Sequence, residues 1–170
     1  DEIPQHLKDY VAKAEEEEKI EKEELQKKAN TVYVSSLSED VIETNSLAGR
    51  FGFKPIVEDE KLELQKSTTV DELYQKLAER YNKKVSQIRL WETNFNRNPV
   101  RFVKPSKETN LAAINTTSTQ MLDFFVQFKD EDEPLEIEEG KIMVYLKFFF
   151  PKKKAPFQYL GHFVVAKEET

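Results

Sequence analysis

The feature that most constrains the fold of this chain is an amphipathic stretch of about 12 residues that ends at Tyr81. Its apolar residues recur at i, i+3, i+4, i+7, i+8 and i+11, which puts them on one side of a helix. Thr69 is followed three residues later by Glu72, the pattern of a capping box at a helix start. The stripe consists of Val70, Leu73, Tyr74, Leu77, Ala78 and Tyr81. The spacing therefore predicts a helix over 70–81 with one face on a packed core.

Segments that alternate polar and apolar residues flank this helix on both sides, as half-buried strands do. We expect strands at 31–38, 61–66, 87–92, 100–103 and 121–129. The segment 39–59 reads as a long loop with a short strand near 53–57, and 104–119 as a polar loop anchored by Leu111 and Ile114.

The order of these elements predicts an α+β fold of the β-grasp type, in which one helix lies across a mixed sheet of four or five strands. The helix between the second and third strands needs a right-handed crossover. The expected core is apolar throughout: Val32, Val34, Leu62, Leu64, Leu73, Leu77, Ile88, Leu90, Leu122, Phe124, Val126 and Phe128.

Residues 1–29 are predicted to form one long charged helix ahead of this domain. Pro4 suits a first helical turn, and no Pro or Gly follows until Gly49. Glu precedes Lys by four residues at several points, for example Glu18–Lys22, which stabilises an isolated helix. A helix that is polar on all sides is typical of a solvated spacer, with binding to a basic groove as the alternative.

The C-terminal part divides into an acidic linker at 131–140 and a predicted β-hairpin within 141–170. Its strands, 141–150 and 157–166, are joined by a proline-bounded loop that contains Lys152–Lys154. Two strands alone do not form an independent unit. Either the hairpin packs on the preceding domain or the natural protein continues beyond this piece, and we favour the second interpretation.

Composition excludes most catalytic chemistry from these 170 residues. The chain has no Cys, two His and four Gly, so thiol nucleophiles, thiolate zinc sites and glycine-rich phosphate loops are not available. The net charge of −6 gives no basic surplus for nucleic acid. The longest apolar run, Ile142–Leu146, is far too short to span a membrane. We therefore expect no catalytic residue, no metal, no cofactor, no nucleic acid and no membrane partner.

Four stretches give the chain a resemblance to a known family. They are Ile3-Pro-Gln-His-Leu at the start of the charged helix, Gln87-Ile-Arg-Leu-Trp91, the hydrophobic strand at 121–129, and Val144-Tyr-Leu-Lys147 with Tyr159-Leu-Gly-His162. Because these stretches occur in this order along the chain, it resembles the segment that follows the catalytic domain in the herpesvirus-associated ubiquitin-specific proteases. The resemblance implies a linker helix (1–29), a ubiquitin-like domain (30–130), an acidic linker (131–140), and the first hairpin of a second, truncated ubiquitin-like domain (141–170).

The same resemblance implies that the parent protein is a papain-like cysteine deubiquitinase of the cytoplasm and nucleus. The catalytic Cys and His boxes are absent from this piece, so we expect it to be a non-catalytic, regulatory and partner-recruiting segment. Its partners would be substrates or regulators of the enzyme, the catalytic domain itself and the following ubiquitin-like domain. The alternatives are a free-standing β-grasp adaptor without an attached enzyme, and a dimer formed through the orphan hairpin.

Arg89 and Trp91 are the candidate partner-binding residues of the sheet. If Ile88 and Leu90 face the helix, the period of two sends Arg89 and Trp91 to the open face of the sheet, where ubiquitin carries its recognition patch. Trp and Arg are also frequent in interface hot spots. The competing interpretation is that Trp91 packs against the linker helix, a charged loop or the hairpin.

The acidic stretch that begins at Asp130 is the second candidate site. Asp130, Glu131, Asp132 and Glu133 could steer basic peptides to the domain, and the competing interpretation is a solvated linker. His162 lies in an apolar strand, and we expect it to be a structural histidine.

Overall fold

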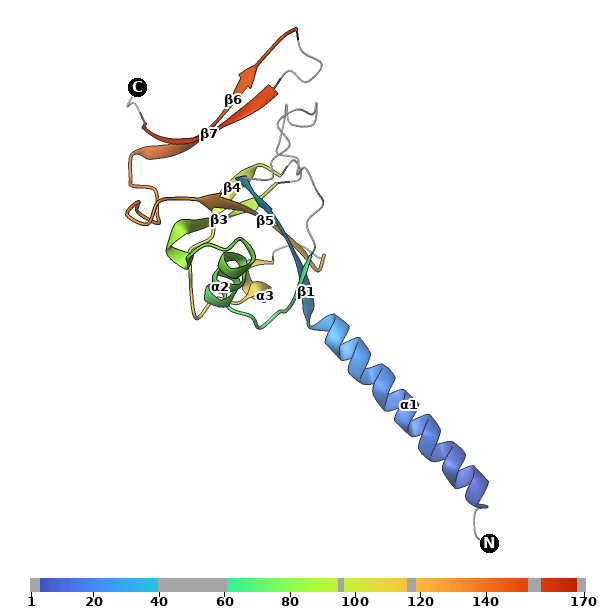
Figure 1. The fold of residues 1–170 in the computed structure, drawn as a ribbon. Coiled ribbons are helices and arrows are strands. Elements are labelled where there is room, and N and C mark those ends of the chain that lie inside the picture. The colour runs from blue at the N-terminus through green and yellow to red at the C-terminus, as the bar shows by residue number, and fades with distance from the viewer. Residues whose placement is uncertain (1–3, 40–60, 95–96, 116–118, 153–156, 168–170) are drawn as a thin grey trace.

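The computed structural model describes residues 4–39, 61–94, 97–115, 119–152 and 157–167. Along the chain they form a long helix, a sheet with helices against one face, and a separate β-hairpin (Figure 1). The short strand expected near 53–57 lies outside the described residues. The α+β class predicted from the order of elements is confirmed.

Five strands form a mixed sheet in the order β2-β1-β5-β3-β4. The central strands β1 and β5 run parallel, with Val34 opposite Leu122, and the other neighbouring pairs are antiparallel. The strands are β1 (Thr31–Ser38), β2 (Leu62–Gln65), β3 (Ile88–Thr93), β4 (Pro99–Phe102) and β5 (Met121–Phe128).

Helix α2 (Val70–Arg80) covers one face of this sheet. The predicted capping box is confirmed: the backbone N–H of Glu72 donates to Thr69 Oγ1 (3.2 Å), and the backbone N–H of Thr69 donates to Glu72 Oε2 (2.7 Å). These bonds satisfy two N–H groups that a helix start leaves unpaired. The apolar stripe points into the core, where Val70, Leu73, Tyr74, Leu77 and Ala78 are buried.

The core between α2 and the sheet matches the expected residues. Ten of the twelve are buried, and Leu62 and Phe128 are half-buried against them. Tyr74 adds a polar contact inside this core, since its hydroxyl donates to the carbonyl oxygen of Val103 (2.6 Å) and accepts from the backbone N–H of Leu90 (3.1 Å). Burial raises the pKa of Tyr74 above its usual range.

Two short helical elements complete the domain. A 3-10 turn, η3 (Val85–Gln87), leads into β3, and α3 (Leu111–Ile114) lies within the segment expected to be a loop. Asn110 caps α3 by accepting from the backbone N–H of Ala113 (3.0 Å). The anchoring role expected of Leu111 is confirmed, because its side chain is fully buried.

Helix α1 (Gln5–Ala29) projects away from the sheet into solvent (Figure 1). Its 25 residues correspond to about 37 Å at 1.5 Å per residue. Exposed ion pairs run along it, among them Glu18–Lys22 at 2.5 Å. At its C-terminal end, Gln120 Nε2 donates to the carbonyl oxygen of Lys28 (2.9 Å), which ties the helix to the start of β5.

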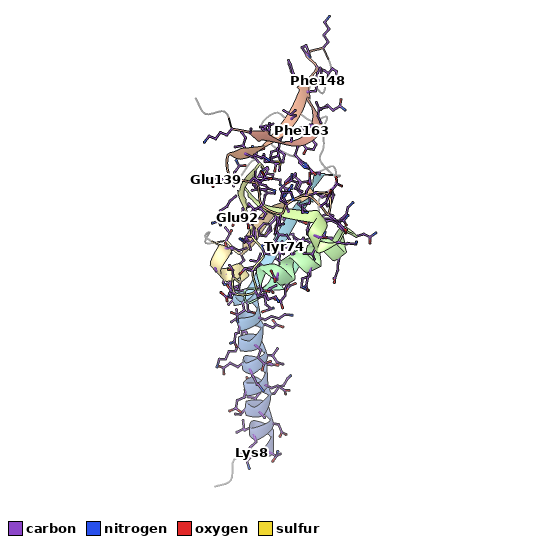
Figure 2. All side chains as sticks on the ribbon, turned by 90° about the vertical axis from the view of Figure 1, so that its left-hand side faces the viewer. Lys8, Tyr74, Glu92, Glu139, Phe148 and Phe163 are labelled. Atoms are coloured by element: carbon purple, nitrogen blue, oxygen red, sulfur yellow. The ribbon has the colours of Figure 1, made fainter. Side chains whose placement is uncertain are left out.

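The hairpin of β6 (Lys141–Phe149) and β7 (Phe157–Ala166) lies over the sheet face opposite α2 (Figure 1). Figure 2 shows it, with Phe148 and Phe163 labelled, at the end of the molecule opposite to Lys8 of α1. The register of the two strands shifts between Leu146 and Lys147. Gly161, opposite Leu146, adopts a φ of +131°, a backbone conformation that residues other than glycine rarely adopt.

Candidate functional site

The sheet face opposite α2, here called the outer face, carries the residues that the sequence singled out. Ile88 and Leu90 are fully buried on the α2 side, and Arg89 and Trp91 lie on the outer face, as the period of two predicts. The expectation that this face is open is wrong, because the acidic linker and the hairpin cover it.

Arg89 is buried beneath the acidic linker, with 2% of its surface exposed. Its Nε donates to the carbonyl oxygen of Leu135 (2.9 Å) and its Nη2 to that of Pro134 (2.5 Å). Its Nη1 lies 3.6 Å from Glu133 Oε2. The guanidinium fork therefore binds three consecutive linker residues and holds the linker on the sheet.

Trp91 is half-buried in a second apolar cluster, together with Leu37, Phe125, Tyr145 and Tyr159. Its Nε1 donates to Gln127 Oε1 (2.8 Å), and Phe102 meets its ring edge-on at 5.6 Å between centroids. Trp91 and two tyrosines of the hairpin, Tyr145 and Tyr159, therefore pack against the same buried pair, Leu37 and Phe125. Whether its remaining surface binds a partner stays a prediction.

Glu39 connects the end of β1 to the hairpin, a role that no pattern in the sequence indicates. Its Oε1 accepts from the Tyr159 hydroxyl (2.6 Å) and lies 2.6 Å from His162 Nδ1, while its Oε2 accepts from the backbone N–H of Phe128 (3.2 Å). The side chains of Glu39 and His162 keep only 14% and 19% of their surface. His162 therefore has the structural role expected of it.

Two tyrosines of the hairpin have raised pKa values at this junction. Burial raises the pKa of Tyr159 above its usual range, and the hydrogen bond to Glu39 raises it further. Burial also raises the pKa of Tyr145, with a smaller contribution from the Glu39 carboxylate. Both hydroxyls therefore stay protonated at neutral pH, and that of Tyr159 donates to the Glu39 carboxylate rather than acting as a base.

The acidic stretch from Asp130 to Glu133 is partly engaged within the chain. Glu131 forms an ion pair with Lys84 (2.6 Å), and the half-buried Glu133 lies beside Arg89. Asp130, Glu131 and Asp132 are exposed on the surface. The carboxylates of Asp130 and Asp132 are therefore exposed at the domain edge, where they can attract a basic segment, while Glu131 is paired with Lys84.

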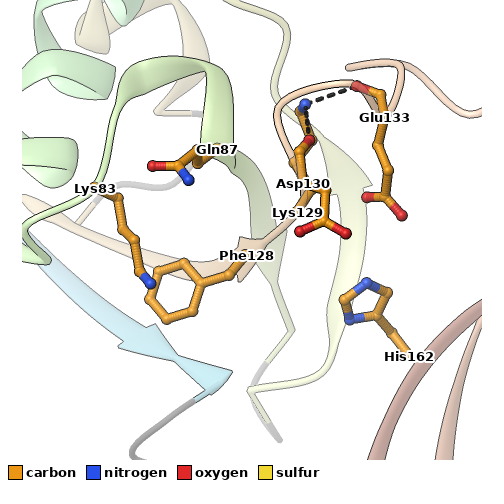
Figure 3. A pocket seen from close by; sticks show the side chains of 7 residues that line it. All are labelled: Lys83, Gln87, Phe128, Lys129, Asp130, Glu133 and His162. Atoms are coloured by element: carbon orange, nitrogen blue, oxygen red, sulfur yellow. Dashed lines mark hydrogen bonds between the residues drawn. The ribbon is translucent and has the colours of Figure 1, made fainter.

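A pocket of about 280 Å³ opens where the linker, β5 and β7 meet (Figure 3). Lys129 Nζ donates into its wall, to the carbonyl oxygens of Asp130 (2.8 Å) and Glu133 (2.7 Å). Lys83 Nζ lies 4.9 Å above the Phe128 ring. The pocket is lined by Lys83, Gln87, Phe128, Lys129, Asp130, Glu133 and His162. Two ammonium groups and two carboxylates line the pocket, a composition suited to polar recognition.

Within the described residues, no group of three or more Asp, Glu or His side chains is placed to hold a metal ion. No helix in this part of the chain is long and apolar enough to cross a membrane.

No family model matches this chain, and no curated protein matches its sequence. Among solved structures, the chain is similar to that of the Arabidopsis thaliana protein At2g32350, with 14% sequence identity and a TM-score of 0.39. The match covers 59% of this chain and 89% of that one. A likeness this distant carries no argument about function.

Proposed function

We propose that this chain is a non-catalytic, partner-recruiting segment of a cysteine deubiquitinase related to the herpesvirus-associated ubiquitin-specific proteases. The observation that carries the proposal is the sheet order β2-β1-β5-β3-β4 with a parallel central pair and α2 across one face. A ubiquitin-like β-grasp domain is expected to have this arrangement. It supports the family resemblance of the sequence, two of whose four stretches form β3 and β5 of this sheet.

In this proposal the chain divides as the resemblance implies: linker helix 1–29, ubiquitin-like domain 30–130, acidic linker 131–140, and the opening hairpin of a second ubiquitin-like domain at 141–170. The exposed α1 acts as a spacer, and its length of about 37 Å sets the distance between the catalytic domain and the ubiquitin-like domain. The chain has no Cys, so the thiol nucleophile comes from the catalytic domain of the parent enzyme.

The segment would act by raising the effective concentration of a bound substrate near the distant active site. The exposed carboxylates of Asp130 and Asp132, together with Glu131 beside Lys84, attract basic segments of substrates or regulators. Trp91, further along β3 opposite Phe125, offers a half-buried aromatic contact, whereas Arg89 holds the linker in place.

The test is steady-state kinetics of the full-length protein on two substrates, a minimal fluorogenic ubiquitin conjugate and a ubiquitinated protein with a basic segment. We expect reversal of Asp130, Glu131 and Asp132 to Lys to raise KM for the ubiquitinated protein several-fold and to leave the minimal substrate unchanged. Reversal of Glu15, Glu16 and Glu17 on the exposed α1 is the matched control, because it makes the same change of charge elsewhere.

Two outcomes would contradict the proposal. Equal kinetics of the linker variant, the control and the wild type on both substrates would refute recruitment through the linker. A full-length protein that binds partners but cleaves no ubiquitin conjugate would favour the free-standing adaptor instead.

A further inference from the structure

The connection between α1 and β1 is a single residue long. Ala29 ends the helix and Thr31 begins the strand, so Asn30 alone joins them, and Figure 1 shows α1 leading directly into β1. Hinges in proteins are loop or element-terminal residues that are free to change their backbone angles. Asn30 lacks this freedom, because its N–H donates to the carbonyl oxygens of Gln26 and Lys27 (both 3.1 Å) and its own carbonyl oxygen accepts from another strand segment, at Lys66 N–H (2.8 Å).

Side chains of the sheet also bond to the last turn of α1. Thr31 Oγ1 donates to the carbonyl oxygen of Lys27 (2.8 Å), and Gln120 Nε2 donates to that of Lys28 (2.9 Å). Both donors are held in place, since Thr31 is 1% exposed and the carbonyl oxygen of Gln120 accepts from the backbone N–H of Tyr33 (2.7 Å). A helix end leaves its last four carbonyl groups without partners in the helix. Here the sheet supplies partners, which fixes the end of the helix on the domain.

Beyond this junction α1 is supported only by its own sequence. Every residue of α1 whose burial is described is exposed. Ion pairs one turn apart, Lys13–Glu17 (3.8 Å) and Lys19–Glu23 (4.0 Å), run along it, and it contains no Gly or Pro. The costly step in forming such a helix is its first turn, with a nucleation constant of about 10⁻³. The junction fixes the last turn, so the helix can grow outward from the domain without that cost.

A rigid helix transmits rotation as well as distance. Each residue adds about 1.5 Å of length and about 100° of turn around the helix axis. A flexible spacer transmits neither a direction nor a rotation, and only sets an effective concentration.

We propose that α1 and the five-stranded sheet form one rigid body, in which the junction nucleates the helix and fixes its direction and its rotation relative to the sheet. This inference deepens the proposed function and rests on it, because α1 then orients the ubiquitin-like domain toward the catalytic domain instead of only separating the two.

The first experiment measures rigidity in the 170-residue chain, without any enzyme attached. The chain has no Cys, so Lys13→Cys with Glu79→Cys gives two spin labels on exposed helix positions, one on α1 and one on α2. Pulsed electron paramagnetic resonance should find one narrow distance peak. Insertion of two Gly residues between Asn30 and Thr31 should at least double the width of that peak.

The second experiment locates the rigidity at the junction. Thr31→Val combined with Gln120→Ala removes the two side-chain hydrogen bonds and should speed amide hydrogen exchange throughout α1 at least five-fold. Gln75→Ala is the matched control, because Gln75 is an exposed glutamine on α2, and it should leave the exchange of α1 unchanged. Circular dichroism melting checks that the domain stays folded.

The third experiment separates rotation from distance in the full-length protein. Deletion of Glu16 turns the catalytic domain by about 100° and shortens α1 by about 1.5 Å, whereas deletion of residues 13–19 leaves it about 20° short of two full turns and shortens α1 by about 10 Å. We expect the one-residue deletion to lower kcat/KM for the ubiquitinated protein at least five-fold and the seven-residue deletion to lower it less than two-fold. The minimal ubiquitin conjugate should be cleaved equally by both.

The outcomes distinguish this inference from the proposed function. A broad distance distribution in the wild type, or unchanged exchange in the double variant, would overturn the rigid junction even if the full-length protein cleaves ubiquitin conjugates. A loss from the seven-residue deletion that equals or exceeds the loss from the one-residue deletion would overturn the orienting role. A narrow distance peak together with no cleavage by the full-length protein would overturn the proposed function, and with it the role toward a catalytic domain, but not the rigid junction.

Discussion

Replacement of Arg89 by Met tests how the acidic linker is held on the outer face. Met keeps most of the apolar volume of the side chain and removes the guanidinium. The change deletes the hydrogen bonds to the carbonyl oxygens of Pro134 (2.5 Å) and Leu135 (2.9 Å) and the contact with Glu133. We expect the linker to detach and the hairpin that follows it to loosen.

The size of the expected loss in stability follows from the burial of the Arg89 guanidinium. Hydrogen bonds from a charged donor contribute about 1.5–3 kcal/mol each, and Arg89 makes two with only 2% of its surface exposed. Glu133 keeps 42% of its side chain exposed, so it can turn to water after the change and adds little to the cost. We therefore expect a loss of about 3 kcal/mol in the free energy of unfolding.

Arg101→Met is the matched control. Arg101 Nε donates to Glu92 (2.9 Å), but 57% of its side chain is exposed, and exposed pairs contribute about 0.2–1 kcal/mol. Urea unfolding gives both free energies, and hydrogen exchange locates the loss, which should fall in 130–149. If Arg89→Met lowers the free energy of unfolding no more than Arg101→Met does, the stabilising role assigned to the buried guanidinium of Arg89 is refuted.

Three further predictions concern pH and backbone conformation. The hydrogen bond from the backbone N–H of Thr69 lowers the pKa of Glu72 below its usual 4.5. The stability that this cap contributes is therefore present above pH 4.5 and is lost as the pH falls through the lowered pKa. The melting temperatures of the wild type and Glu72→Gln should converge in acid, and a constant difference between them would contradict this. The pKa of Tyr159 is raised above 10.0, so the stability that its protonated hydroxyl contributes is present below pH 10 and is lost as the pH rises further. Tyr159→Phe should therefore lessen the fall in melting temperature between neutral and alkaline pH. An identical fall in the variant and the wild type would argue against the Glu39 junction. Gly161→Val should lower the free energy of unfolding by about 1–3 kcal/mol through its φ of +131°, since nothing lies within 4 Å of an added Cβ. Ala166→Val in the same strand is the control, and equal stability of the two variants would refute backbone strain.

The parts of the fold with a local period could be predicted from the sequence. The helix expected at 70–81 is Val70–Arg80, and the strand expected at 121–129 is Met121–Phe128. In both cases one side of the element is apolar, and that side alone fixes the period and the face. Helix α3 was missed because four residues are too few to show a helical period.

The candidate site could be predicted only where it depends on alternation. That rule placed Arg89 and Trp91 on the outer face, but their partners are set by tertiary contacts: the carbonyl oxygens that Arg89 binds lie 45 and 46 residues further along the chain. Glu39 begins a segment with no period, and the side chains it holds lie 120 and 123 residues away. No local pattern could have indicated contacts over such separations.

The most direct test of the account is the turnover of a minimal ubiquitin conjugate by the full-length protein and by the 170-residue chain, assayed side by side. The account predicts cleavage by the full-length protein and none by the chain, which has no Cys to supply a thiol nucleophile. Cleavage by the isolated chain, or no cleavage by the full-length protein, would contradict it.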